Sequence, residues 1–272
     1  MKIGLRAFAC VLSGVMMFSM TAGAAAEEAA KTPAEQSTAT MPVEVKAKSA
    51  VLMDLNTGKV LMAQNEHEKM APASVTKIMT LLLIAEAIDA GEIARTDVVT
   101  ASTEASQKGG SQIWLKEGEQ MTVDELLRAA AIASANDAST ALAEHLCGSE
   151  QAFVDQMNKR AGELGMADTH FENCTGLDDT ATNHLTSAYD IAVMSRELML
   201  RHSWIQEYTT VWMDSLRDGA TQLVNTNKLI RFYSGATGLK TGTTALPIGN
   251  CYSGEYEPCC GCDGLRHQQR SL

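Results

Sequence analysis

The sequence predicts an α+β domain in which a cluster of helices packs on an antiparallel sheet. Three observations predict it: a hairpin signal near the start of the globular region, several helix signals in its middle, and a glycine-punctuated strand signal near its end. Strands first, then helices, then a late strand are typical of a sheet covered by helices. No internal repeat is present in the sequence.

The first 26 residues have the composition of a secretory signal peptide. Lys2 and Arg6 give a positive start, residues 7–22 are mostly apolar, and residues 24–26 are alanines suited to cleavage. A transmembrane anchor is the alternative, but polar residues interrupt a short apolar stretch. We therefore expect an exported protein of the cell envelope, with residues 27–41 as a flexible spacer.

One globular domain is expected over residues 42–244. Two apolar runs, 50–54 and 59–63, flank an Asn-Thr-Gly turn and predict a hairpin. Pro72 then precedes a helix over residues 74–90 that is apolar around most of its circumference. Such a helix is expected in the core of a globular domain.

Helix-start signals divide the middle of the chain. Thr122 and Glu125 have capping-box spacing and predict a helix through Ala133, which residues 134–137 then interrupt. Further elements are expected over these ranges: a helix to about residue 146, helices at 152–164 and 187–200, and a strand within 235–242.

Composition limits the kinds of partner. A net charge of −11 argues against a nucleic-acid partner, although an anionic substrate at a locally positive site is allowed. Cys147 and Cys174 are isolated, and we favour unpaired thiols over a disulfide between them. No metal site is expected, because His170 and His184 lack the spacing of a zinc-binding helix.

Ser74 and Lys77 open the long apolar helix and form a Ser-x-x-Lys motif. A serine hydroxyl needs an adjacent base to become nucleophilic, and three residues along a helix place Lys77 on the same face as Ser74. The helix N-terminus adds backbone N–H groups near the reacting atom. The motif is weak alone, since a chain of this length holds about one by chance.

Two further motifs follow in order. Ser134-x-Asn136 falls at a helix junction, and Lys240-Thr241-Gly242 falls at the predicted late strand. Either could be structural, as a helix break or a solvated strand end. Three such motifs in this order and in these contexts are a strong signal for a serine acyl-transfer site.

The chain resembles the serine penicillin-binding proteins, specifically the low-molecular-mass D-alanyl-D-alanine carboxypeptidases of peptidase family S11. The resemblance covers about residues 43–243. It implies a β-lactamase/transpeptidase-like fold. It rests on residues 71–80, 109–111, 134–137, 175–178, 184–190 and 237–242.

The resemblance implies a covalent mechanism without a cofactor. Ser74 attacks the carbonyl between the two terminal D-alanines of a peptidoglycan stem peptide. Lys77 takes the hydroxyl proton, and we expect burial and the charge of Lys240 to lower its pKa so that it is neutral. The backbone N–H groups of Ser74 and Thr243 form the oxyanion hole, and water hydrolyses the acyl-enzyme.

The other motif residues are expected to bind substrate and move protons. Ser134 relays the proton to the departing D-alanine, and Asn136 holds the substrate amide. Lys240 and Thr241 face the terminal carboxylate, while the strand edge pairs with the peptide backbone. The implied substrate-binding residues are Asn136, Lys240, Thr241, Gly242 and Thr243.

A class A β-lactamase is a less favoured alternative. That enzyme needs a glutamate-positioned water for deacylation. Glu163 and Glu172 are available, but neither lies in a Glu-x-x-Leu-Asn setting, and Ala135 stands where a β-lactamase often has Asp. We therefore expect β-lactams to act as covalent inhibitors that acylate Ser74 and stay.

Residues 245–272 do not match the family. Four cysteines crowd this segment, but they do not form two Cys-x-x-Cys pairs, so we favour a truncation or frameshift over a zinc site or a disulfide cluster. The segment is expected to be disordered and the sheet incomplete, which would leave the strand of Lys240 as an exposed edge and Thr243 poorly held. The family's membrane-anchor helix is not found. A non-catalytic remnant or a penicillin-binding module is therefore a second hypothesis.

Overall fold

The computed structural model describes residues 45–177, 181–243, 247–253 and 258–263. The predicted signal peptide and spacer lie outside these residues. The helices are α1 (Lys77–Asp89), α2 (Thr103–Ser106), α3 (Val123–Ile132), α4 (Asn136–Cys147), α5 (Glu150–Glu163), α6 (Ala188–Arg201), α7 (Gln206–Thr209) and α8 (Leu229–Phe232), with 3-10 helices at Ala73–Thr76 and Ser203–Ile205. The strands are β1 (Ser49–Asp54), β2 (Val60–Gln64), β3 (Val98–Thr100), β4 (Gln120–Thr122), β5 (Met213–Leu216), β6 (Thr221–Val224), β7 (Ala236–Gly238), β8 (Thr241–Thr243), β9 (Pro247–Ser253) and β10 (Pro258–Asp263).

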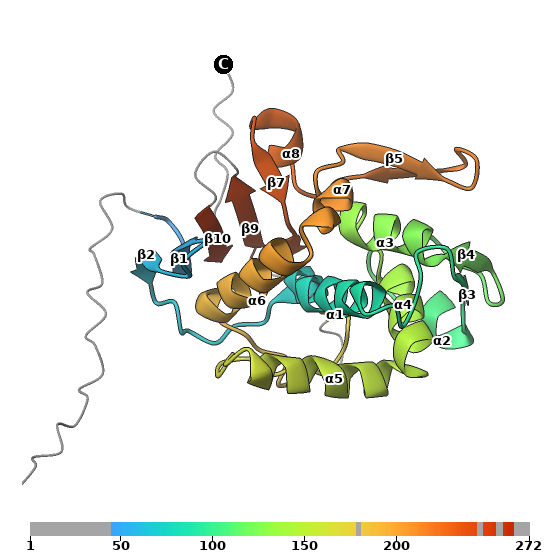
Figure 1. The fold of residues 1–272 in the computed structure, drawn as a ribbon, viewed down its shortest axis with the longest axis horizontal. Coiled ribbons are helices and arrows are strands. Elements are labelled where there is room, and N and C mark those ends of the chain that lie inside the picture. The colour runs from blue at the N-terminus through green and yellow to red at the C-terminus, as the bar shows by residue number, and fades with distance from the viewer. Residues whose placement is uncertain (1–44, 178–180, 244–246, 254–257, 264–272) are drawn as a thin grey trace, which may run out of the picture. The chain divides into compact units, whose positions relative to one another are not determined.

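A six-stranded sheet forms one layer of the domain (Figure 1). Its strand order is β2-β1-β10-β9-β7, and β8 also pairs with β9. β1 and β2 form the predicted antiparallel hairpin. Its turn is held by the Asp54 carboxylate, which accepts hydrogen bonds from the backbone N–H and the hydroxyl of Thr57.

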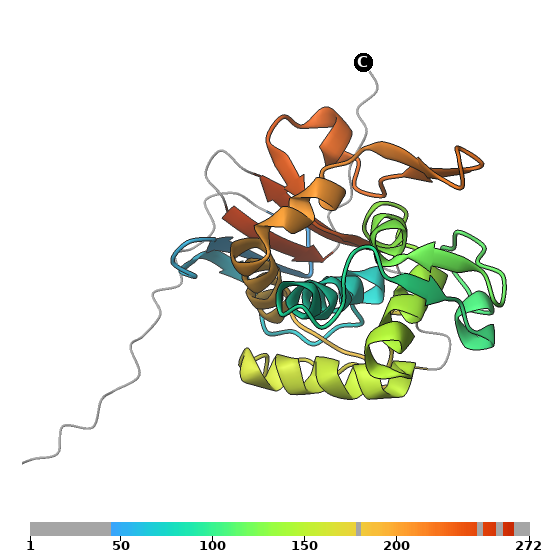
Figure 2. The same cartoon turned by 45° about the vertical axis from the view of Figure 1, so that its right-hand side comes forward.

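The helices pack against one another and against the sheet, which confirms the predicted α+β class. Helix α1 is buried along nearly its whole length, as its apolar circumference predicts. Helix α6 packs against α1 and also against β1 and β10 of the sheet. Figures 1 and 2 both place α5 on the side of α1 away from the sheet. Two small two-stranded sheets, β3–β4 and the β5–β6 hairpin, contact α3.

The helix starts follow the sequence signals closely. Thr122 and Glu125 form the predicted capping box at the start of α3. Ser187 caps α6 by accepting a hydrogen bond from the backbone N–H of Asp190. Cys147 and Cys174 are both free thiols, as favoured above. Within the described residues, no helix combines the length and the apolar character that crossing a bilayer requires.

The sheet differs from the expectation of an incomplete one. Residues 247–253 and 258–263 are strands β9 and β10, and β10 lies between β1 and β9. The expected disorder of the segment is therefore wrong for these two stretches, and its other residues lie outside the described ones. Backbone groups make the ladder, so a segment with unusual side chains can still pair with its neighbours.

Strands β7 and β8 lie at the end of the strand order and pair with β9 on one side. Thr241, Gly242 and Thr243 are in register with residues 249, 248 and 247 of β9. The strand that carries the third motif is thus supported along one side by a neighbouring strand.

Candidate active site

Ser74 lies in the 3-10 helix Ala73–Thr76, one turn before α1 begins at Lys77. The predicted helix start is thus correct in place, but its first turn is 3-10 rather than α-helical. The Nζ atom of Lys77 lies 3.1 Å from Ser74 Oγ, within hydrogen-bond distance. The Ser-x-x-Lys spacing therefore brings the hydroxyl and the amine together, as predicted.

Lys77 is completely buried. Its Nζ donates a hydrogen bond to the carbonyl oxygen of Thr175 at 2.8 Å. Burial lowers the pKa of Lys77 to about 7, although Cys174 and Asp137 act in the opposite direction. In a large fraction of the molecules the Lys77 side chain is therefore a neutral amine at neutral pH, as a base acting on Ser74 requires.

Lys240 is the second buried amine of the site. It is only 1% exposed, and its Nζ donates to the carbonyl oxygen of Thr241 at 3.0 Å. Burial lowers its pKa well below the usual lysine value, and the positive charge of Lys77 lowers it further. Burial is the main cause that lowers the pKa of Lys77, and each buried amine disfavours the charged form of the other.

Ser134 and Asn136 lie at the junction of α3 and α4, as predicted. Ser134 has a φ of +61° and a buried Oγ without a hydrogen-bond partner among the described residues. The side-chain nitrogen of Asn136 donates to the carbonyl oxygen of Gly109 at 2.7 Å, while its Oδ1 is buried and has no partner there either. Two polar atoms are thus left available for a ligand.

These segments enclose a cavity of about 300 Å³. Five predicted site residues line it, while Lys77, Lys240 and Gly242 do not. Gly242 lies against the turn before Ser74, because a Cβ atom there would lie 2.8 Å from the carbonyl oxygen of Pro72. The lining residues are Ala73, Ser74, Gly110, Ser111, Ser134, Asn136, Gly176, Leu177, Thr226, Thr241 and Thr243.

Neither glutamate considered for a β-lactamase is among the residues that line this cavity. Glu163 pairs with Lys159 and Arg160 at the end of α5. Glu172 accepts hydrogen bonds from the backbone N–H groups of residues 182 and 183. The described residues that line the cavity include no Asp or Glu.

Asp137 is a buried carboxylate that the motif analysis did not single out. It accepts hydrogen bonds from the backbone N–H groups of Ile113 and Leu115. The backbone N–H of Asn136 donates to the carbonyl oxygen of Ser111 at 2.7 Å. These bonds join the start of α4 to the loop at 109–115. They therefore fix the second motif relative to Gly110 and Ser111, which line the cavity.

The segment around Thr175 and Gly176 contacts Ala73 and Lys77, the neighbours of Ser74 in the first motif. Gly176 has a φ of +78°, and a Cβ atom there would lie 1.7 Å from the carbonyl oxygen of Ala73. The Glu150 carboxylate accepts a hydrogen bond from the backbone N–H of Cys174. The Thr-Gly-Leu-Asp stretch was noted in the sequence only as a likeness to the family, and its contacts could not be derived from the sequence.

His184 is hydrogen-bonded to the 3-10 helix that carries Ser74. Its Nδ1 accepts a hydrogen bond from the backbone N–H of Glu172, so its proton is on Nε2, which donates to Thr76 Oγ1 at 2.8 Å. Burial lowers the pKa of His184 to about 4. The residue is therefore a neutral structural histidine at neutral pH. Among the described residues, no group of three or more His, Cys, Asp or Glu side chains is arranged to hold a metal ion.

Comparison with known proteins agrees with this geometry. Residues 35–254 match the peptidase S11 family, D-alanyl-D-alanine carboxypeptidase. The chain is 44% identical over 270 residues to D-alanyl-D-alanine carboxypeptidase DacF of Bacillus subtilis. The matched region covers 98% of this chain and 64% of that protein. It is 38% identical over 242 residues to D-alanyl-D-alanine carboxypeptidase DacD of Escherichia coli. This match covers 86% of this chain and 60% of that protein. The chain thus spans less than two thirds of the length of these two relatives.

Solved structures show the same likeness. Penicillin binding protein 6B from Escherichia coli matches with a TM-score of 0.74 at 35% identity, over 82% of this chain and 72% of that one. Penicillin-Binding Protein D2 from Listeria monocytogenes, in an ampicillin-bound form, matches with a TM-score of 0.68 at 27% identity, over 82% of this chain and 91% of that one. The chain belongs to the peptidase S11 family of D-alanyl-D-alanine carboxypeptidases.

Proposed function

We propose that this chain is a serine-type carboxypeptidase that removes the terminal D-alanine from peptidoglycan stem peptides through an acyl-enzyme on Ser74. The observation that carries the proposal is the placement of Ser74 Oγ 3.1 Å from the buried Lys77 amine. A serine with a neutral amine at that distance is an activated nucleophile. The family membership supports the choice of a D-alanyl-D-alanine substrate.

In the proposed acylation step, Ser74 Oγ attacks the carbonyl carbon of the penultimate D-alanine and Lys77 takes its proton. The backbone N–H groups of Ser74 and Thr243 donate to the oxyanion. The register of Thr243 with residue 247 of β9 supports this role. Lys240 lies directly before Thr241, which lines the cavity, and binding of the substrate carboxylate nearby would favour the charged form of its buried amine.

The second motif completes the proposed cycle. Ser134, whose Oγ has no partner among the described residues, passes a proton to the departing D-alanine. Asn136 uses its unpaired Oδ1 to accept a hydrogen bond from the substrate amide. Thr241 faces the terminal carboxylate, and its hydroxyl lies 2.8 Å from that of Thr226. Water then hydrolyses the ester and releases Ser74.

A fluorescent penicillin and a stem pentapeptide test the proposal together. We expect covalent labelling of the wild-type protein, its loss in Ser74→Ala, and release of D-alanine from the pentapeptide. Labelling without D-alanine release would favour a penicillin-binding module, and no labelling of folded protein would favour a non-catalytic remnant. Rapid turnover of nitrocefin would instead favour a β-lactamase.

Export to the cell envelope belongs to the same proposal, because peptidoglycan lies outside the cytoplasm. It rests on the positive, apolar and alanine-rich start of the chain. Fractionation of cells that produce the full chain tests it. We expect the protein outside the cytoplasm with its N-terminus near residue 27, and an uncleaved cytoplasmic protein would contradict it.

A further inference from the structure

Glu150 is a buried carboxylate at the first residue of α5, where it is only 9% exposed. An acidic residue is common in the first turn of a helix because it interacts favourably with the helix dipole, but that interaction does not require burial. Burying a carboxylate is costly unless the group is paired and hydrogen-bonded. The reason for its burial must therefore be found in its partners.

The two carboxylate oxygens of Glu150 contact two different segments. Oε1 accepts hydrogen bonds of 3.1 Å from the backbone N–H and from the thiol of Cys174. Oε2 forms an ion pair with the Nζ atom of Lys108. Burial raises the pKa of Glu150, but the hydrogen bonds from Lys108 and Cys174 outweigh it and lower the pKa overall. Glu150 is therefore a charged bridge between residues 108 and 174.

Cys174 directly precedes the residue that holds the Lys77 amine. The carbonyl oxygen of Thr175 accepts a hydrogen bond from Lys77 Nζ at 2.8 Å. The hydroxyl of Thr80 donates to the carbonyl oxygen of Cys174 at 2.6 Å. Cys174 is thus held by α1 through its carbonyl group and by α5 through its N–H. Glu150 supplies the second of these contacts, one residue before the acceptor that orients Lys77.

Lys108 directly precedes the residue that holds the Asn136 amide. The carbonyl oxygen of Gly109 accepts a hydrogen bond from Asn136 Nδ2 at 2.7 Å. Gly110 packs closely on the same group, because a Cβ atom there would lie 2.6 Å from that nitrogen. A shift of this segment would therefore move Asn136. Glu104 also pairs with Lys108, but it lies only four residues away and does not join the segment to another part of the fold.

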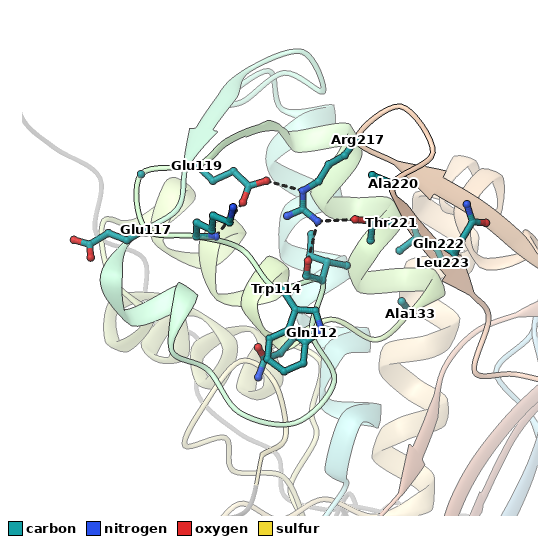
Figure 3. A pocket seen from close by; sticks show the side chains of 13 residues that line it. Gln112, Trp114, Glu117, Glu119, Ala133, Arg217, Ala220, Thr221, Gln222 and Leu223 are labelled. Atoms are coloured by element: carbon teal, nitrogen blue, oxygen red, sulfur yellow. Dashed lines mark hydrogen bonds and ion pairs between the residues drawn. The ribbon is translucent and has the colours of Figure 1, made fainter.

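The loop at 108–119 has a second anchor at its far end. Figure 3 shows the guanidinium of Arg217 bonded to Glu119 and Thr221. Arg217 thus holds the far end of the loop against the β5–β6 hairpin. The ion pair of Lys108 with Glu150 joins its near end to α5.

We propose that Glu150 is a positioning residue that fixes the base and the amide-binding residue of the site relative to each other. Through Cys174 it holds the carbonyl group that orients Lys77, and through Lys108 it holds the carbonyl group that orients Asn136. The inference rests on the proposed function, in which these two residues act on the nucleophile and the substrate amide. Glu150 is not among the residues that line the catalytic cavity, so it acts only through the two segments.

Three substitutions separate the two contacts of Glu150. Glu150→Gln keeps an oxygen for the backbone N–H of Cys174 but loses the ion pair with Lys108. Lys108→Met removes the same ion pair from the other side and keeps an unbranched apolar chain. Glu150→Ala removes both contacts. Acylation rates over a series of penicillin concentrations give a limiting rate and a half-saturating concentration for each variant.

The two variants that lose only the ion pair should bind penicillin more weakly. We expect the half-saturating concentration to rise about tenfold in Glu150→Gln and Lys108→Met, because Asn136 is less well placed. Their limiting acylation rate should keep a pH midpoint near 7, because Thr175 still holds Lys77.

Glu150→Ala should also change the limiting rate and its pH profile. Once Cys174 is released from α5, Thr175 no longer holds the Lys77 amine, and the limiting rate should fall about tenfold. A charged amine gains more from that acceptor than a neutral one does, so the pH midpoint should move below 7 by about half a unit or more. The titratable groups that face Lys77 stay the same in this variant: Cys174, Asp137 and Lys240.

Glu86→Gln is the matched control. Glu86 is a half-buried carboxylate that pairs with Arg160 of α5 at 2.7 Å, and it is not among the residues that line the catalytic cavity. Loss of this ion pair should lower stability while the half-saturating concentration and the pH midpoint stay unchanged. If Glu150→Ala does not fold, the two ion-pair variants decide the test.

Folded Glu150 and Lys108 variants whose kinetics match those of Glu86→Gln overturn this inference and leave the proposed function standing. A wild-type protein that neither binds penicillin nor releases D-alanine overturns the proposed function instead.

Discussion

The carbonyl oxygen of Thr175 lies 2.8 Å from the Nζ atom of Lys77, which in turn lies 3.1 Å from Ser74 Oγ. A carbonyl oxygen only accepts hydrogen bonds, so it fixes one N–H of the amine. A neutral amine then has a lone pair free for the serine hydroxyl. The carbonyl group of Thr175, far from Lys77 in sequence, thus orients the amine toward Ser74, as the proposed base requires.

Acylation should depend on pH through Lys77. Burial lowers its pKa to about 7, and only the neutral amine accepts a proton. The rate of penicillin acylation should therefore rise about tenfold per pH unit below 7 and level off above it. Stopped-flow or gel-based acylation rates from pH 5.5 to 9 measure this. A rate independent of pH over that range would contradict the role of Lys77 as base.

Lys77→Arg is the matched control for that profile. The guanidinium keeps the positive charge but does not lose its proton in this range. Acylation should fall to background at every pH, while a folded protein with a native circular dichroism spectrum remains. Substantial acylation by this variant would show that the proton acceptor is another group.

The sequence predicted the elements whose signals are local. The capping box at Thr122, the apolar face of α1 and the hairpin at residues 50–63 depend on neighbours in the chain, and all three are confirmed. The same holds for the pairing of Ser74 with Lys77, which a helical turn enforces.

Features that depend on distant segments could not be derived in this way. The roles of Thr175 and Asp137 arise from hydrogen bonds to residues far away in sequence. We expected disorder in residues 247–253 and 258–263 because of their side-chain composition. This expectation was wrong because strand pairing uses backbone groups.

Gly176→Ala should damage both stability and acylation. The added methyl group would lie 1.7 Å from the carbonyl oxygen of Ala73, so the turn that carries Ser74 must move. Gly165→Ala is the control, because it has a similar φ of +73° with nothing within 4 Å. Urea unfolding should show Gly165→Ala losing about 1 kcal/mol and Gly176→Ala at least about 3 kcal/mol. Equal losses would show that the contact with Ala73 does not matter.

Ser134→Ala should separate activity from stability. The buried Oγ of Ser134 has no hydrogen-bond partner among the described residues, so its removal costs the fold no hydrogen bond. We expect the free energy of unfolding to stay within about 0.5 kcal/mol or to rise. Release of D-alanine should fall by about 100-fold or more, because proton transfer to the leaving amine is lost. A stable variant with near-normal D-alanine release would exclude Ser134 from proton transfer.

His184 should make stability fall in mild acid. Its pKa is lowered from 6.5 to about 4 in the folded state, so the unfolded chain binds more protons between these two values. The stabilisation is complete above pH 6.5 and is lost as the pH falls toward 4, with about 2 kcal/mol lost between pH 7.5 and 5. Protonation of Nδ1 would break its hydrogen bond with the backbone N–H of Glu172. Urea unfolding at both pH values should show this loss reduced in His184→Gln, whose side chain does not titrate. An equal loss in the two proteins would assign the acid sensitivity to other groups.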